Sequence, residues 1–108
     1  MVTYREREYT IHDSCVNRQA LRLVAERYQV KADIYGYDKP EIINGYIPDI
    51  QATNNNKTII IEVEGKDSIN EDKKQIDTFK KYAQYNYNTT FELYLAINKT
   101  KCLLRGTW

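Results

Sequence analysis

Apolar residues recur at helical spacing in two stretches of the chain, and the first covers residues 13–28. One face of this predicted helix is apolar, which is typical of a helix packed against a core. Its apolar members are Val16, Ala20, Leu23, Val24 and Tyr28. Asp13 or Ser14 can cap the first turn, because a side-chain oxygen there accepts a hydrogen bond from a free backbone N–H. We therefore predict that the helix begins at one of these two residues.

The second helical stretch follows Ser68 and Glu71. A Ser followed three residues later by a Glu forms a capping box, in which each side chain accepts a hydrogen bond from a backbone N–H. Asn86 or Asn88 can end this helix. Its predicted apolar face holds Ile69, Ile76, Phe79 and Ala83.

Alternating or continuous apolar runs predict four strands. They cover residues 28–37, 47–52, 57–65 and 91–97. The run 57–65 contains three consecutive isoleucines, so we expect it to be buried on both faces and central in the sheet. Asparagines at 54–56 favour a hairpin turn before it. The order α-β-β-β-α-β predicts an α/β fold with a mixed central sheet flanked by helices, and residues 101–108 are compatible with a short additional edge strand.

Length and composition restrict the class of protein. A chain of 108 residues, 42% of them hydrophobic, predicts a single globular domain spanning residues 1–108. The net charge of +1 means that any binding to nucleic acid depends on local basic clusters. No apolar run reaches the ~20 residues that span a membrane, and the N-terminus lacks a signal-peptide apolar region, so an intracellular, cytoplasmic protein with no membrane partner is expected. Cys15 and Cys102 are expected to be reduced, with one disulfide as the alternative.

Acidic residues cluster around the most apolar strand. Side chains on a strand alternate between faces, so Glu62 and Glu64 point the same way, with Cα atoms about 7 Å apart. Pairing around the asparagine turn brings Asp49 near them, and Lys66 continues the same parity. Carboxylates this close repel each other unless a cation lies between them, and oxygen ligands suit Mg²⁺ or Mn²⁺. The alternative is a pair of carboxylates that faces solvent and binds nothing.

The run Pro48-Asp49, followed about a dozen residues later by Ile-Ile-Glu62-Val63-Glu64, resembles the motif of the PD-(D/E)xK nuclease superfamily. This superfamily includes many restriction endonucleases and Holliday junction resolvases. The resemblance covers roughly residues 14–97 and implies a restriction-endonuclease-like αβββαβ core. It also implies Mg²⁺- or Mn²⁺-dependent hydrolysis of DNA phosphodiester bonds.

The resemblance implies a set of metal ligands. Asp49 corresponds to the metal-bridging aspartate and Glu62 to the second ligand. The main-chain carbonyl of Val63 corresponds to a third. Glu26 is the candidate for the extra acidic residue that many members carry on their first helix.

The motif departs from the family at Glu64, because most members have a Lys there. Some restriction enzymes of the superfamily carry Glu at this position, so the departure puts the general base in doubt without excluding activity. Lys66 is the candidate to supply the missing cation beside the phosphate. Ser68 and Gln75 resemble polar residues that hold the site or the phosphate in resolvase-like members.

The remaining candidates each have two interpretations. Lys73 and Lys74, with Lys80 and Lys81 one heptad later, either contact phosphates or form a solvated helix face. His12, the only histidine, is interpreted as a surface residue, with a general base as the less favoured alternative. Tyr82, Tyr85 and Tyr87 either stack on bases or pack at the helix surface or a dimer contact.

The leading hypothesis is a Mg²⁺-dependent endonuclease acting on DNA, with Asp49, Glu62, Glu64 and Lys66 as catalytic residues. A single domain of this size offers little surface to grip a duplex, so a homodimer with two sites is predicted. The alternative is a catalytically inactive module with the nuclease fold, which binds nucleic acid or a protein partner.

Overall fold

The computed structural model describes residues 9–108 as two helices and five strands. They are α1 (Ile11–Ala25), β1 (Gln29–Ala32), β2 (Ile50–Asn54), β3 (Lys57–Glu64), α2 (Lys73–Tyr85), β4 (Thr89–Asn98) and β5 (Lys101–Thr107). The predicted order α-β-β-β-α-β is confirmed, and β5 extends the sheet by one strand. Among residues 9–108, no helix combines the length and the apolar character that crossing a membrane requires.

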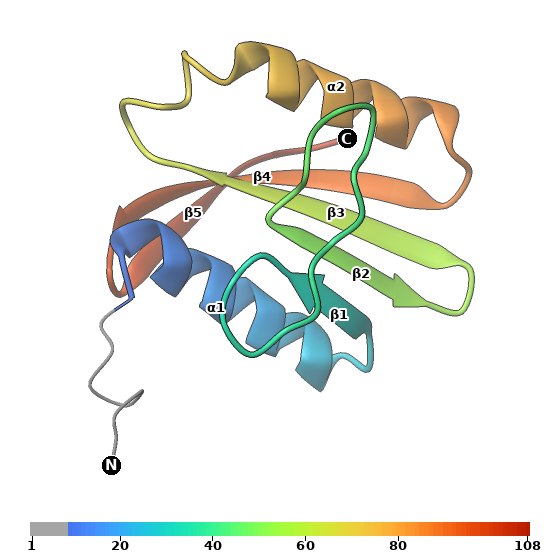
Figure 1. The fold of residues 1–108 in the computed structure, drawn as a ribbon, viewed down its shortest axis with the longest axis horizontal. Coiled ribbons are helices and arrows are strands. Elements are labelled where there is room, and N and C mark those ends of the chain that lie inside the picture. The colour runs from blue at the N-terminus through green and yellow to red at the C-terminus, as the bar shows by residue number, and fades with distance from the viewer. Residues whose placement is uncertain (1–8) are drawn as a thin grey trace.

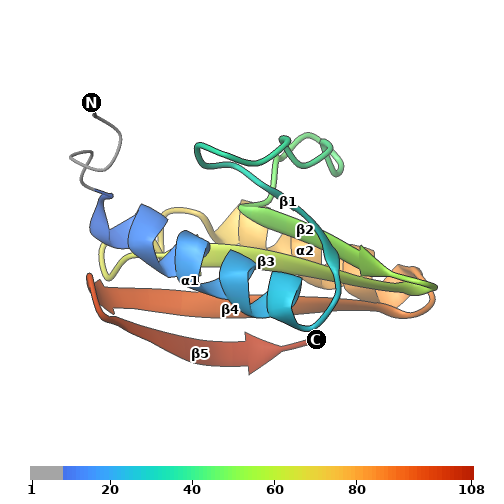
Figure 2. The ribbon, with the colours of Figure 1, turned by 90° about the horizontal axis from the view of Figure 1, so that it is seen from below.

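The sheet has the strand order β1-β2-β3-β4-β5 and separates the two helices (Figure 1). Only β3 and β4 run parallel, since α2 connects them, and the other neighbours are antiparallel. Figure 2 shows α1 in front of the sheet and α2 behind it. The fold is therefore α/β with a mixed sheet, as predicted.

β3 is central, and its residues 60–64 are all buried. Its side chains alternate between two apolar clusters. Ile61 and Val63 belong to the cluster under α1, whereas Ile60 lies in the cluster under α2 with Phe79 and Phe91. The prediction from three consecutive isoleucines is confirmed, because both faces of this strand are covered by a helix.

α1 begins earlier than predicted. Thr10 is its N-cap, and the Thr10 hydroxyl accepts a hydrogen bond from Asp13 N at 3.0 Å. The prediction of a cap at Asp13 or Ser14 was wrong, because Thr10 already satisfies the free N–H of the first turn. The earlier start places His12 within the first turn of the helix.

α2 begins later than the capping box predicted. Its first residue is Lys73, and its N-cap, Asp72, makes no side-chain capping bond. Residues 66–72 form turns instead. The Ser68 hydroxyl accepts a bond from Gly65 N at 3.0 Å and donates one to Glu64 Oε1 at 2.7 Å. The buried Glu64 carboxyl thus takes the hydroxyl that was expected to cap the helix.

Two strands are shorter than predicted because a long loop separates them. β1 ends at Ala32, and β2 begins only at Ile50, so Asp49 precedes the strand on which it was expected. Gly36 and Gly45 have positive φ angles within this loop, where chain reversal needs a left-handed backbone. Asp33 N donates to the carbonyl of Asp49 at 2.9 Å and ties the loop ends together.

Cys15 and Cys102 form a disulfide that links α1 to β5. Their Cα atoms lie 5.7 Å apart, although 87 residues separate them in sequence. This differs from the expected reduced pair. Nothing in the spacing of two isolated cysteines shows that a helix and an edge strand bring them together.

Candidate active site

Three carboxylates come together at the end of β3. The ladder pairs Ile50 with Ile61, which places Asp49 opposite Glu62, as the hairpin geometry predicted. Asp49 N donates to Glu62 Oε1 at 3.3 Å. The residues retain only 9% (Asp49), 4% (Glu62) and 2% (Glu64) of their accessible surface. These acids lie inside the protein, which contradicts the alternative of a solvent-facing pair.

Asp49 completes the hydrogen bonding of β3 where β2 begins. Its Oδ2 accepts a bond from Val63 N at 2.8 Å, so a side chain replaces the missing backbone partner. The N–H and C=O of a strand residue point to the same side, because paired residues exchange both bonds. The Val63 carbonyl therefore also points to the side of Asp49, where its predicted role as a ligand requires it.

His12 is a site residue that the sequence interpretation missed. Its Nε2 lies 3.2 Å from Asp49 Oδ2, and its Nδ1 lies 2.9 Å from Asp13 Oδ1. The hydrogen bond to Asp49 raises the pKa of His12 to about 9, partly offset by burial, and Asp13 adds to the increase. The imidazole is therefore protonated at neutral pH and is the cation next to Asp49.

A signal for His12 was present in the sequence. It precedes Val16 by four residues and so continues the apolar stripe of the helix. The assumed helix start at Asp13 or Ser14 left it outside that stripe. Recognition of Thr10 as the cap would have placed it on the face that packs against the sheet.

Glu62 receives its partner from α2. Gln75 Nε2 donates to Glu62 Oε2 at 2.6 Å, and Gln75 precedes Ile76, which anchors α2 in the core. Burial raises the pKa of Glu62 far above its ordinary value, and the nearby charge of Asp49 raises it further. Two buried carboxylates this close repel each other when both are charged, and a cation bound between them removes this repulsion.

Glu64 lies between Glu62, with which its carboxyl group interacts, and the turn 66–72. Its Oε1 accepts the hydroxyl of Ser68 at 2.7 Å. Burial raises the pKa of Glu64 to about 7, the Ser68 bond opposes this, and the Asp72 carboxyl adds to it. Glu64 and Ser68 together fix the turn that follows β3.

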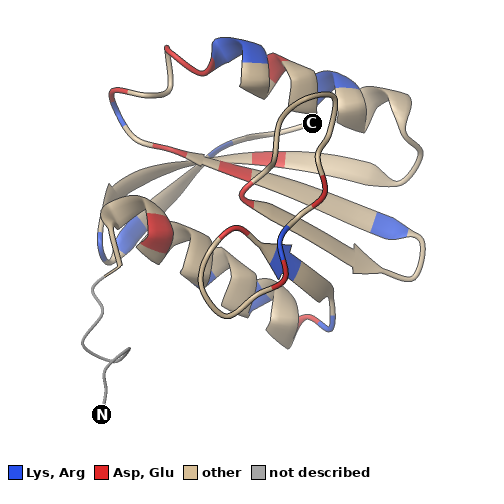
Figure 3. Ribbon diagram, in the orientation of Figure 1, with Lys and Arg blue, Asp and Glu red and all other residues tan. Residues whose placement is uncertain are grey.

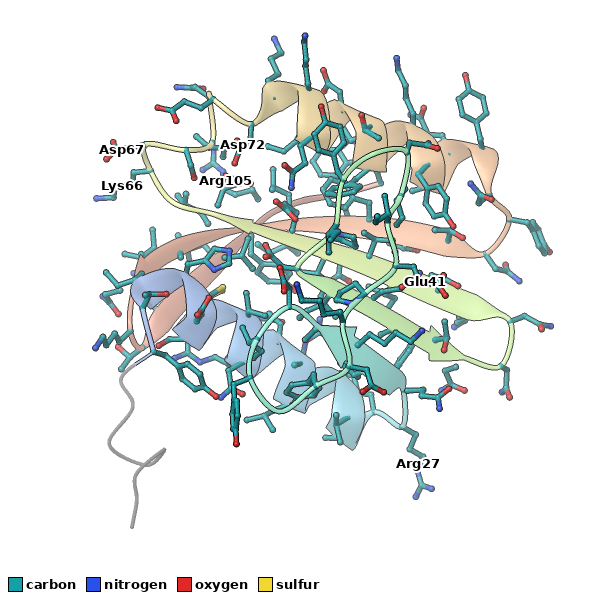
Figure 4. The ribbon with its side chains drawn as sticks, in the orientation of Figure 1. Arg27, Glu41, Lys66, Asp67, Asp72 and Arg105 are labelled. Atoms are coloured by element: carbon teal, nitrogen blue, oxygen red, sulfur yellow. A yellow bond between two sulfur atoms is a disulfide. The ribbon has the colours of Figure 1, made fainter. Side chains whose placement is uncertain are left out.

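Two predicted residues do not join the cluster. Lys66 follows Gly65 in the exposed turn, and its side chain points outward (Figure 4). Within residues 9–108 it makes no hydrogen bond or ion pair. Glu26 is the C-cap of α1, about 21 Å along the helix from His12 at 1.5 Å per residue. Its Oε2 pairs with Arg22 Nη1 at 3.4 Å, so its placement does not support the predicted role as a metal ligand.

The charged residues around the site are unevenly distributed. Figure 3 shows acidic positions at the end of β3 and along the turn 66–72, followed by basic positions at the start of α2. Lys73 and Lys74 are exposed there and are available to an anionic ligand. The structure thus brings two predicted polar residues, Ser68 and Gln75, to the carboxylates and leaves the two lysines at the rim.

The oxygen donors at the end of β3 come from two side chains and one main-chain carbonyl. No group of three His, Cys, Asp or Glu side chains within residues 9–108 is arranged to hold an ion. Asp49 and Glu62, with the Val63 carbonyl, instead form an oxygen set of two carboxylates and one backbone group. This set fits Mg²⁺ or Mn²⁺, since Mg²⁺ keeps several waters and takes one or two protein carboxylates.

Comparison of the chain with protein-family models, curated proteins and solved structures finds no match.

Proposed function

We propose that the protein is a metal-dependent deoxyribonuclease of the PD-(D/E)xK type, with Asp49 and Glu62 holding Mg²⁺ or Mn²⁺. The observation that supports this most directly is the pair of buried carboxylates facing each other across the start of the β2–β3 ladder. The α-β-β-β-α-β order, with these acids on neighbouring segments, also supports a restriction-endonuclease-like core.

The chain's own residues have separate tasks in this proposal. When bound, the ion polarises a phosphoryl oxygen and lowers the pKa of a water molecule. His12 holds Asp49 in position from α1, and Gln75 holds Glu62 from α2. Each carboxylate is thereby oriented by a hydrogen-bond partner on a different helix, and such partners fix the direction in which a metal ligand points.

The missing motif Lys has a different substitute from the one first predicted. Lys66 points outward, whereas the His12 imidazolium lies beside Asp49. We assign the cationic role beside the phosphate to His12. Glu64, bonded to Ser68, supports the turn after β3 and the position of Glu62.

The experiment is cleavage of single-stranded, duplex, flapped and four-way-junction DNA with Mg²⁺, Mn²⁺ or EDTA. The wild type is expected to cut at least one substrate with metal and none with EDTA. Asp49→Asn is expected to be inactive, and Asp67→Asn, in the exposed turn, is the matched control. A wild type that cuts nothing, or an Asp49→Asn variant as active as wild type, contradicts the proposal.

The second candidate is an inactive module that keeps the fold and binds nucleic acid or protein. The Glu at position 64 favours it, since this position usually carries a Lys in the superfamily. Titration of Mn²⁺ by calorimetry distinguishes the two when combined with the cleavage assay. An ion bound at Asp49 should raise the melting temperature of the wild type but not of Asp49→Asn.

The predicted homodimer and cytoplasmic location are also part of the proposal. Two copies would present two sites for a cut in both strands. Light scattering of the purified chain tests the dimer directly, and a monomeric mass contradicts it.

A further inference from the structure

A polar pocket lies at the opposite end of β3 from the carboxylates. It has a volume of about 530 Å³, within the range of roughly 300–1,000 Å³ typical of ligand pockets. Figures 1 and 2 both show the β2–β3 turn and the α2–β4 loop at this end of the sheet. From Lys57 to Glu62 the strand extends about 17 Å, so the two sites are separate.

The lining of this pocket combines aromatic rings with amide side chains. Tyr28 and Tyr87 line it, and Tyr87 is 93% exposed. Gln84 and Asn88 contribute amides, and Asn88 O holds the start of β3 through a bond from Thr58 N. Exposed rings stack on bases, and an amide group can bond a base edge with both its donor and its acceptor.

One basic residue of the pocket, Lys57, is available to an anionic ligand. The pocket's single carboxylate, Glu92, already accepts bonds from Arg22 and from the hydroxyl of Tyr94. Lys57 is exposed and has no ion-pair partner within residues 9–108. Arg22 is shared between Glu92 and Glu26, so Lys57 is the charged group of the pocket that is left to meet a phosphate.

We propose that this pocket binds an unpaired nucleotide, with its base against Tyr87 and its phosphate near Lys57. Binding in this pocket does not depend on cleavage at the carboxylates, so it can be tested separately from the nuclease proposal. An intact duplex hides the faces of its bases, so binding should be selective for single strands. A free nucleotide carries the same chemistry as one nucleotide of a strand.

The test uses the full chain in EDTA, where no metal-dependent cleavage occurs. A fluorescein-labelled single strand of twelve adenines, chosen as the probe, is titrated and followed by anisotropy. Tyr87→Leu should raise Kd by about tenfold, since stacking on one ring contributes roughly 1–3 kcal/mol. Tyr87→Phe keeps the ring and should bind like the wild type. Lys57→Gln should lower the slope of log K against log salt by about 0.7.

Matched controls distinguish binding in the pocket from nonspecific binding of the strand. Tyr85 is 82% exposed on the same helix end but does not line the pocket, so Tyr85→Leu should leave Kd unchanged. Annealing the strand to its complement should weaken binding more than tenfold. Displacement of the strand by AMP identifies free nucleotides as sufficient, and failure of AMP to compete identifies the strand as the ligand.

Three results overturn the proposal. One is equal binding by Tyr87→Leu and wild type, with unchanged melting temperatures. Another is duplex binding as tight as single-strand binding. The third is binding of N-acetylglucosamine in place of the oligonucleotide, which would make the pocket a saccharide site.

Discussion

The two ends of β3 differ in how the backbone ladder is completed, and this difference explains their chemistry. At the amino end, Asn54 pairs with Lys57 across a tight turn, and Lys57 and the turn residues 55–56 are exposed. At the carboxyl end, β3 continues past the start of β2, and the side chain of Asp49 bonds the free Val63 N–H. A carboxylate is therefore drawn into the interior where the ladder is incomplete, and it meets Glu62 there.

The polar groups at the two ends of β3 also differ in burial. The carboxyl end holds buried groups with raised pKa values, His12 and Glu62 among them, and such groups gather at functional sites. The amino end holds the exposed ring of Tyr87 and several amides, which suit contact with a planar ligand.

Glu62→Gln should abolish the metal response of the carboxyl end. The amide keeps the size of the side chain but removes the charge with which Glu62 would hold the ion. Loss of an outer-shell partner costs about 10–100-fold in activity, so loss of a ligand should cost more than about 100-fold. The measurement is the rate of DNA cleavage, with Mn²⁺ calorimetry on the same sample. Retained Mn²⁺ binding in this variant would remove Glu62 from the site.

His12→Ala should lower the cleavage rate by about 10–100-fold. The ring orients Asp49 from α1, so its loss loosens the ligand without removing it. Asn17→Ala, elsewhere on the same helix, is the control. An unchanged rate for His12→Ala would show that His12 does not contribute to cleavage.

Without metal, the free energy of unfolding should fall as pH rises from about 4.5 to about 9. Glu64, with a folded pKa of about 7, binds its proton more tightly in the folded chain than in the unfolded one, so stability is lost between pH 4.5 and 7. His12 stabilises the folded state fully below pH 6.5, and this contribution is lost as pH rises through about 9. Urea unfolding in EDTA measures this, and His12→Gln should make the slope above pH 7 shallower, while Glu62, whose pKa is raised by burial, still contributes there. Stability that rises with pH over this window contradicts the pKa directions.

Asn55→Ala should destabilise the amino end by about 1–2 kcal/mol. Asn55 has a φ of 54° in the β2–β3 turn, a left-handed conformation that Asn tolerates better than Ala because its short polar side chain can bond locally. Asn55→Gly should match or exceed the wild type, since Gly adopts positive φ freely. Thermal unfolding of both variants measures this, and equal melting temperatures for Asn55→Ala and the wild type would contradict the prediction.

Lys66→Ala should change neither stability nor cleavage by more than about 0.5 kcal/mol, the usual range for a surface substitution. The side chain is exposed and points away from the carboxylates. A loss of cleavage beyond tenfold would show that Lys66 turns toward the phosphate after all.

The sequence predicted those features that depend on local pattern. The element order, the central position of β3 and the pairing of Asp49 with Glu62 all follow from periodicity and a turn. The start of α2 did not, because Ser68 bonds Glu64 in place of the helix. Capping rules consider only neighbouring backbone groups, whereas a buried carboxylate competes for the same hydroxyl.

The features that were missed depend on contacts between distant segments. His12 meets Asp49 across 37 residues, and Cys15 meets Cys102 across 87. Glu26 was placed near the site because it lies on the first helix, but the direction of that helix carries it to the far end. Helix direction relative to a sheet is set by packing, which a single sequence does not display.

The link between Cys15 and Cys102 gives the molecule the topology of a closed ring. Residues 15–102 form one covalent loop that contains α2, β1–β4 and all three carboxylates. A protease cut at any single bond inside this loop, for example in the exposed turn 66–72, leaves one connected molecule. Two cuts are needed to release a fragment, and only reduction converts a nicked chain into two separate pieces.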